Sequence, residues 1–118
     1  MKINLAVRRR DTARKIAASP WECTVYRRGR TREDAVVSFS FTGTIVPMRS
    51  PGDVSTSIVA QPPAGMQGWL CVAPYDADVI KGQDEMEAVS PGGITHYYIV
   101  IYSAQYDQEQ QAVMYERQ

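Results

Sequence analysis

Histidine and cysteine are scarce in this chain of 118 residues, which has one histidine, His96, and two cysteines, Cys23 and Cys71. A structural zinc site takes about four ligands, mostly from these residue types, and a disulfide framework takes several cysteine pairs. The sequence predicts neither arrangement. We expect Cys23 and Cys71 to be buried thiols that a reducing compartment keeps reduced, and we expect no bound metal and no cofactor.

Long hydrophobic runs are also lacking. The longest one, Tyr97–Tyr102, has six residues, whereas a helix that spans a membrane needs about 20. The short apolar segment 3–7 precedes a run of arginines, whereas a secretory signal places positive charge first and a longer apolar stretch after it. We therefore expect no contact with a membrane and a location in the cytoplasm of the cell that makes the protein.

The net charge is zero, but the two signs are separated along the chain. Residues 1–32 hold ten basic and two acidic side chains, a balance of +8, and residues 33–118 hold three basic and eleven acidic ones, a balance of −8. This separation indicates either a basic face for an anionic partner or copies of the chain that dock head to tail.

The pattern of apolar residues predicts one helix followed by strands. Residues 7–19 favour a helix that ends at Ser19-Pro20, because a residue before proline is pushed out of the helical region. Its apolar stripe is expected to contain Leu5, Ala13, Ile16 and Ala17. From Trp21 the period changes to two, which predicts strands at 21–26, 37–45, 68–73, 85–89, 94–103 and 110–116.

We therefore predict a single domain, 1–118, of the mainly β class. It is a small antiparallel β-barrel or sandwich of about six strands over residues 21–116, with a short N-terminal helix and one long loop, 48–66, rich in proline, glycine and serine. In the strand 94–103, one face is expected to hold Thr95, Tyr97, Ile99 and Ile101, and the other Tyr98, Val100 and Tyr102. Apolar residues on both faces indicate a central strand or a strand of a closed barrel.

The sequence offers no set of residues for catalysis. His96 lies within a strand and is interpreted as structural, and both cysteines fall in the apolar phase of their strands. The aspartates Asp76, Asp78 and Asp84 do not fit a calcium loop, because the position that needs glycine for a sharp turn holds lysine. We interpret these aspartates as capping residues of a turn and predict that the protein is not an enzyme and has no catalytic residues.

The order of these elements resembles a family of virus proteins. A short basic helix ends in Ser19-Pro20, and a strand leads into an arginine-bearing turn. A long polar loop then precedes Gly68–Pro74, and Pro74–Val79 with Lys81–Asp84 gives the most specific match. A tyrosine-rich strand and a final strand complete the chain. Together these features are similar to the head-closure (head-completion or stopper) proteins, the head-tail connectors of long-tailed bacteriophages.

The resemblance implies a structural protein of the virion neck, assembled in the cytoplasm of the bacterial host. Such a protein forms a homo-oligomeric ring of six-fold or twelve-fold symmetry. Its partners are an adaptor or portal ring, a tail terminator or tail tube, and packaged DNA, which the ring retains in the channel. The implied channel-loop or plug candidates are Arg49, Asp53, Val54, Ser55, Thr56, Ser57, Ile58 and Val59. The basic candidates that face DNA or a protein partner are Arg8, Arg9, Arg10, Arg14 and Lys15.

Two other functions remain open at this point. A tail-terminator protein belongs to the same neck, whereas a neck adaptor is expected to be mostly helical, which the strand pattern opposes. A small β-barrel that binds nucleic acid would use the basic helix on phosphates, but the acidic remainder of the chain would repel them.

Overall fold

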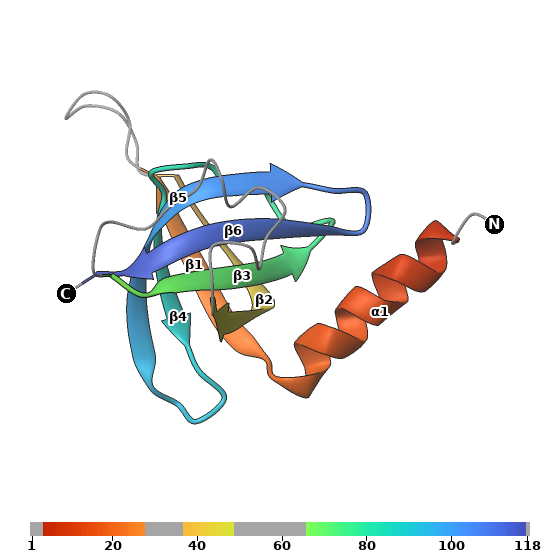
Figure 1. Cartoon of the computed structure of the whole chain (residues 1–118), viewed down its shortest axis with the longest axis horizontal. Helices are drawn as coiled ribbons and strands as arrows, with labels where there is room; N and C mark the ends of the chain where they lie inside the picture. The colour runs from red at the N-terminus through yellow and green to blue at the C-terminus, as the bar shows by residue number, and fades with distance from the viewer. Residues whose placement is uncertain (1–3, 28–36, 49–65, 118) are drawn as a thin grey trace.

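The chain folds into a closed β-barrel of six antiparallel strands with one helix before it, which is one of the two architectures, barrel or sandwich, that the sequence predicted (Figure 1). The structure is a computed structural model, and it describes residues 4–27, 37–48 and 66–117. The strands follow each other around the barrel in the order β1-β2-β3-β6-β5-β4, and β4 pairs back to β1. Closure satisfies the backbone groups that an open sheet would leave at its edges.

The secondary-structure elements lie close to their predicted positions. They are the helix α1 (Leu5–Ala18) and the strands β1 (Trp21–Arg27), β2 (Val37–Pro47), β3 (Gly68–Pro74), β4 (Glu85–Val89), β5 (Thr95–Gln105) and β6 (Glu109–Glu116). β1 and β2 pair antiparallel, as expected for consecutive strands. The pairs β1–β4 and β3–β6 join strands that are far apart in the sequence.

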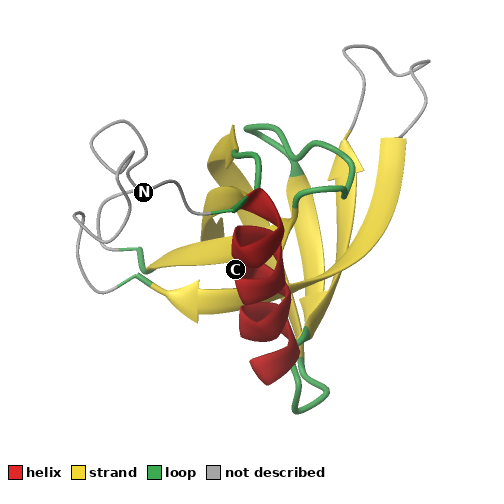
Figure 2. Cartoon of the chain, turned by 90° about the vertical axis from the view of Figure 1, so that its right-hand side faces the viewer, coloured by secondary structure: helices red, strands yellow, loops and turns green. Residues whose placement is uncertain are grey.

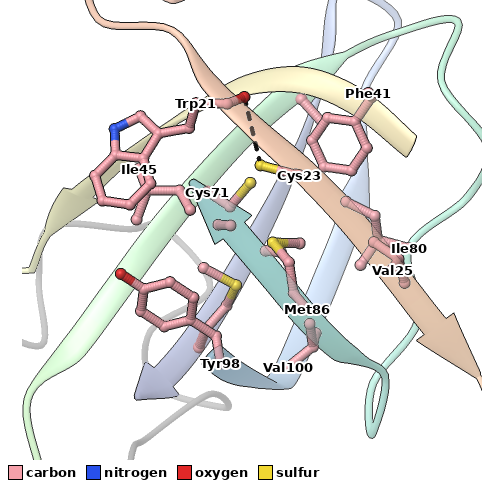
Figure 3. Packing of buried hydrophobic residues seen from close by; sticks show 14 residues of the cluster. Trp21, Cys23, Val25, Phe41, Ile45, Cys71, Ile80, Met86, Tyr98 and Val100 are labelled. Atoms are coloured by element: carbon pink, nitrogen blue, oxygen red, sulfur yellow. Dashed lines mark hydrogen bonds between the residues drawn. The ribbon is translucent and has the colours of Figure 1, made fainter. Parts of the chain in front are cut away.

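The core fills the interior of the barrel with alternate residues of each strand. It contains Trp21, Cys23, Val25, Phe41, Ile45, Cys71, Ala73, Ile80, Met86, Ala88, Tyr98, Val100, Ala112 and Met114 (Figure 3). Cys23 and Cys71 are buried here as free thiols, as predicted. The neighbouring Cys23 thiol, together with burial, raises the pKa of Cys71 well above its usual value. Both cysteines are buried and pack in the core as small apolar side chains.

The predicted faces of β5 are wrong beyond Val100. The pairing of β5 with β6 shifts between Val100 and Tyr102, so Val100 lies opposite Met114 and Tyr102 opposite Val113. The bulge leaves Ile101 unpaired in this register and turns Tyr102 away from the face that Tyr98 and Val100 share. Tyr102 packs instead on Val113, which lies outside the main core cluster. A strict period of two cannot anticipate a bulge, because the extra residue inverts the alternation.

Helix α1 begins two residues earlier than predicted, because the Asn4 side chain accepts a hydrogen bond from the Ala6 N–H at 2.8 Å and caps the first turn. Its buried residues are Thr12 and Ile16, whereas Ala13 and Ala17 are exposed. The predicted apolar stripe was therefore correct for Ile16 and wrong for both alanines. α1 packs mainly against β2 and β3, contacts Glu109 at the start of β6, and lies along one side of the barrel (Figure 2).

Gly43 in β2 makes a close approach that leaves no room for a side chain. A Cβ atom at this position would lie 2.7 Å from the carbonyl oxygen of Val72 and 2.9 Å from a ring carbon of Phe41. We expect Gly43→Ala to lower the free energy of unfolding by about 1–3 kcal/mol through overpacking. Gly92→Ala is the control, since its Cβ would meet nothing nearer than 3.8 Å. Equal urea midpoints for the two variants would contradict this prediction.

Candidate interaction surface on the N-terminal helix

Buried polar contacts fix α1 on the barrel. The Thr12 hydroxyl donates to Glu109 Oε1 at 2.8 Å, and Lys15 Nζ lies 3.7 Å from the same oxygen. The Gln111 amide donates to the other Glu109 oxygen at 2.9 Å. Glu109 is buried, so its carboxylate depends on these donors in place of water. Thr12 is therefore buried beside Ile16 because its hydroxyl donates a hydrogen bond to a buried carboxylate.

Arg9 is the second attachment point of α1. Its Nε donates to the Asp107 carbonyl oxygen at 3.1 Å, in the turn between β5 and β6. Its guanidinium carbon lies 3.6 Å from the centre of the Tyr75 ring, which follows β3. A guanidinium stacked on an aromatic face and bonded to a carbonyl holds a defined orientation. Arg9 therefore joins the helix to two loops at one end of the barrel.

The remaining arginines of α1 face solvent. Arg8, Arg10 and Arg14 are exposed, and among the residues that the structure describes none of them forms an ion pair. Arg10 and Arg14 are four residues apart, so they share one face of the helix. The five basic residues singled out in the sequence therefore separate into two groups. Arg9 and Lys15 contact the barrel, and the other three are free to meet an anionic partner.

A shallow groove of about 410 Å³ runs between α1 and the barrel. Its helix side is formed by Ala13, Ile16 and Ala17, and Pro20 and Tyr75 line it further along. Small alanine side chains leave this space open where longer ones would fill it. The groove presents mainly apolar surface, next to the exposed arginines of the same helix.

Asp84 takes part in a buried ion pair. Arg27 Nε and a terminal nitrogen of the same guanidinium donate to the two Asp84 oxygens at 2.9 and 2.8 Å, and the Lys81 N–H donates to Asp84 Oδ2 at 2.8 Å. The hydrogen bond to Asp84 raises the pKa of Arg27 above its usual value. Asp76 and Asp78 are exposed. No group of histidine, cysteine, aspartate and glutamate that could hold a metal ion occurs in the described part of the chain.

His96 contacts a carboxylate and two aromatic rings of the barrel. Its Nδ1 is 2.9 Å from Glu116 Oε1, and its ring packs against Trp21 and Tyr98, with centroids 5.5 and 6.1 Å away. The Cys23 thiol donates to the Trp21 carbonyl oxygen at 3.7 Å instead of meeting the histidine. The Tyr98 hydroxyl is buried without a hydrogen-bond partner among the described residues, and burial raises the pKa of this group. These residues present no nucleophile beside a base.

Gln110 is a key residue that the sequence analysis did not identify. Its amide nitrogen donates to the carbonyl oxygens of Ala77 and Asp78 at 2.8 and 3.1 Å, and its oxygen accepts from the Ile80 N–H at 3.1 Å. Through these bonds it fixes the loop between β3 and β4, so that Ile80 enters the core. No sequence signal marks this glutamine, because its partners are backbone groups about 30 residues away.

The predicted channel-loop candidates, Arg49, Asp53 and 54–59, lie outside the described residues. The ends of this segment are described. The Met48 N–H donates to the Gly68 carbonyl oxygen at 2.9 Å, and the Gln67 side chain donates to the Met48 carbonyl oxygen at 2.7 Å. The segment therefore leaves and re-enters the barrel at adjacent points of β2 and β3.

No family model, curated protein or solved structure matches this chain. Within the described residues, no helix combines the length and the apolar character needed to cross a membrane.

Proposed function

We propose that this protein is a head-closure protein of a long-tailed bacteriophage. In this role it forms a ring in the virion neck, retains packaged DNA and presents the surface to which the tail attaches. The observation that carries the proposal is the order of the elements. A basic helix precedes a closed six-stranded barrel, and a segment rich in proline and glycine joins β2 to β3. This is the order on which the sequence resemblance rests.

The character of the surface supports an assembly role. Arg8, Arg10 and Arg14 face solvent on a helix that Thr12 and Arg9 fasten to the barrel. A basic face held on a rigid element suits contact with an acidic protein ring or with DNA phosphates in a channel. The partners in this proposal are further copies of the chain, the adaptor or portal ring, the tail terminator or tail tube, and the packaged DNA.

The test is disruption of the gene in the phage that carries it. We expect heads filled with DNA, separate tails and no infectious particles, and we expect peptides of this chain in purified wild-type virions. Normal infectious virions from the disrupted phage would overturn the proposal. Recovery of the chain on free tails instead of heads would also overturn it, in favour of a tail terminator.

Complementation of the disrupted gene refines this test. Wild-type protein should restore infectivity, whereas a variant with Arg8→Gln, Arg10→Gln and Arg14→Gln should restore much less, because it lacks the basic face. Lys81→Gln is the control, since Lys81 is an exposed cation on a different element. Circular dichroism confirms in each case that the barrel is folded.

A further inference from the structure

The hairpin between β4 and β5 carries the most exposed apolar side chains among the described residues. Ile94 is 62% exposed and Tyr97 is 52% exposed. The hairpin extends beyond the body of the barrel in both views (Figures 1 and 2). An isoleucine at such a position has no role in the core of its own chain.

The tip of this hairpin is rigidly built. The Ser90 N–H donates to the Ile94 carbonyl oxygen at 2.8 Å, the Gly93 N–H donates to the Ser90 carbonyl oxygen at 2.8 Å, and the Ile94 N–H donates to Ser90 Oγ at 3.2 Å. Gly93 has a φ of 86°, which glycine adopts without strain. Since the turn is already ordered, little conformational entropy is lost when Ile94 binds a partner.

The groove beside α1 is the apolar recess that such a side chain would fit. Ala13, Ala17 and Tyr75 line it. No residue of 85–105 lines the groove, so the hairpin of the same chain does not fill it. An exposed apolar side chain and an unfilled apolar groove on the same molecule favour a contact between copies.

Charge favours the same pairing. The α1 helix carries five basic side chains and one acidic one, Asp11. Residues 85–105, which include the hairpin, carry no lysine or arginine, and of their two glutamates Glu85 is ion-paired with Arg117, which leaves Glu87 as the acidic residue. Placing the hairpin of one copy beside the helix of another brings opposite charges together, whereas pairing helix with helix brings like charges together.

We propose that the β4–β5 hairpin of one copy docks, through Ile94, into the groove between α1 and the barrel of a second copy. The two surfaces differ, so the contact is heterologous and repeats from copy to copy, which closes a ring if the rotation permits. The proposal rests on the proposed function for its expectation that several copies assemble.

Photo-crosslinking tests this contact directly. Ile94 is replaced with the photoreactive residue p-benzoylphenylalanine in the full chain, and the protein is irradiated at about 1 mM, where contacts with millimolar dissociation constants are populated. We expect crosslinked dimers and higher multimers, with the crosslink mapped by mass spectrometry to α1 or to the Pro74–Asp76 side of the groove. The same photoreactive residue at the exposed position 81 is the control and should crosslink far less. Crosslinks elsewhere, or none above the control, overturn the proposal.

Mixing two variants tests the heterologous geometry. Ile94→Asp removes the apolar projection, and Ala17→Arg fills the groove; both residues lie outside the core. Ile94→Asp carries no photoreactive residue, whereas the Ala17→Arg variant carries one at position 94 and should give no crosslinked multimers alone. In a mixture, that protein should crosslink to Ile94→Asp, whose groove is intact, and the products should stop at dimers. Crosslinked multimers from the Ala17→Arg protein alone overturn the contact. These assays need no virion, so their failure is distinguishable from failure of the neck function, which the gene disruption measures.

Discussion

Asp84→Ala is expected to lower the free energy of unfolding by about 3 kcal/mol, the magnitude typical of removing one partner of a buried ion pair. Asp84 is 2% exposed and Arg27 is 28% exposed in their side chains. The truncation would leave Arg27 Nε and the Lys81 N–H without their acceptor, while the Arg27 terminal nitrogen keeps its hydrogen bond to the Val79 carbonyl oxygen. An unpaired buried donor costs more than the original bond contributed. The loop before β4 would lose its Asp84 contact with β1 and keep the one from Arg27 to the Val79 carbonyl oxygen.

The measurement is equilibrium unfolding in urea, followed by tryptophan fluorescence. Asp78→Ala is the control, because Asp78 is an exposed aspartate in the same loop and only its backbone takes part in the Gln110 contact. We expect this control to change stability by less than about 0.5 kcal/mol. Similar midpoints for both variants would show that the ion pair contributes little and that the loop is held by Gln110.

Deletion of 51–63 with a short Gly-Ser bridge is expected to abolish infectivity while leaving the barrel folded. The resemblance to head-closure proteins implies that this segment acts in the channel of the proposed ring or at a contact between its subunits. The fold should survive because Met48 and Gly68 are hydrogen-bonded to each other across β2 and β3. A short linker can therefore join the strands without a change of register, and a shorter loop costs less closure entropy.

The measurement compares infectivity, DNA retention and particle composition after complementation of the disrupted gene. We expect the deletion protein to be present on heads that leak DNA or fail to join tails. A second variant, in which 51–63 is replaced by a Gly-Ser linker of equal length, separates the effect of length from that of the side chains. Normal yields of infectious virions with the deletion variant would show that the segment has no part in closing the channel.

The local elements could be predicted because they depend on neighbours in the sequence. Alternation of apolar and polar residues identified all six strands, and Ser19-Pro20 marked the end of the helix. The apolar phase also predicted correctly that Cys23 and Cys71 are buried. A period of two or of 3.6 is a property of a single segment, so one sequence suffices to detect it.

The candidate surface could be predicted only in part. The sequence identified the basic residues of the helix. Which of them contact the barrel and which face solvent depends on what the helix packs against. Arg9 is held by Tyr75 and the Asp107 carbonyl oxygen, and Lys15 lies near Glu109. These partners are distant in the sequence, and no local pattern indicates which side of a basic helix will face them.

The sequence by itself determined the mainly β class, the positions of the strands and the separation of charge along the chain. The tertiary structure decided that the strands close as a barrel rather than stack as a sandwich, through the β1–β4 and β3–β6 pairs. It also decided the bulge after Val100, the Arg27–Asp84 pair and the role of Gln110. The physical reason is common to all of these. Each depends on contacts between distant segments, whose free energy is gained only when the whole barrel has closed and water has been excluded from its interior.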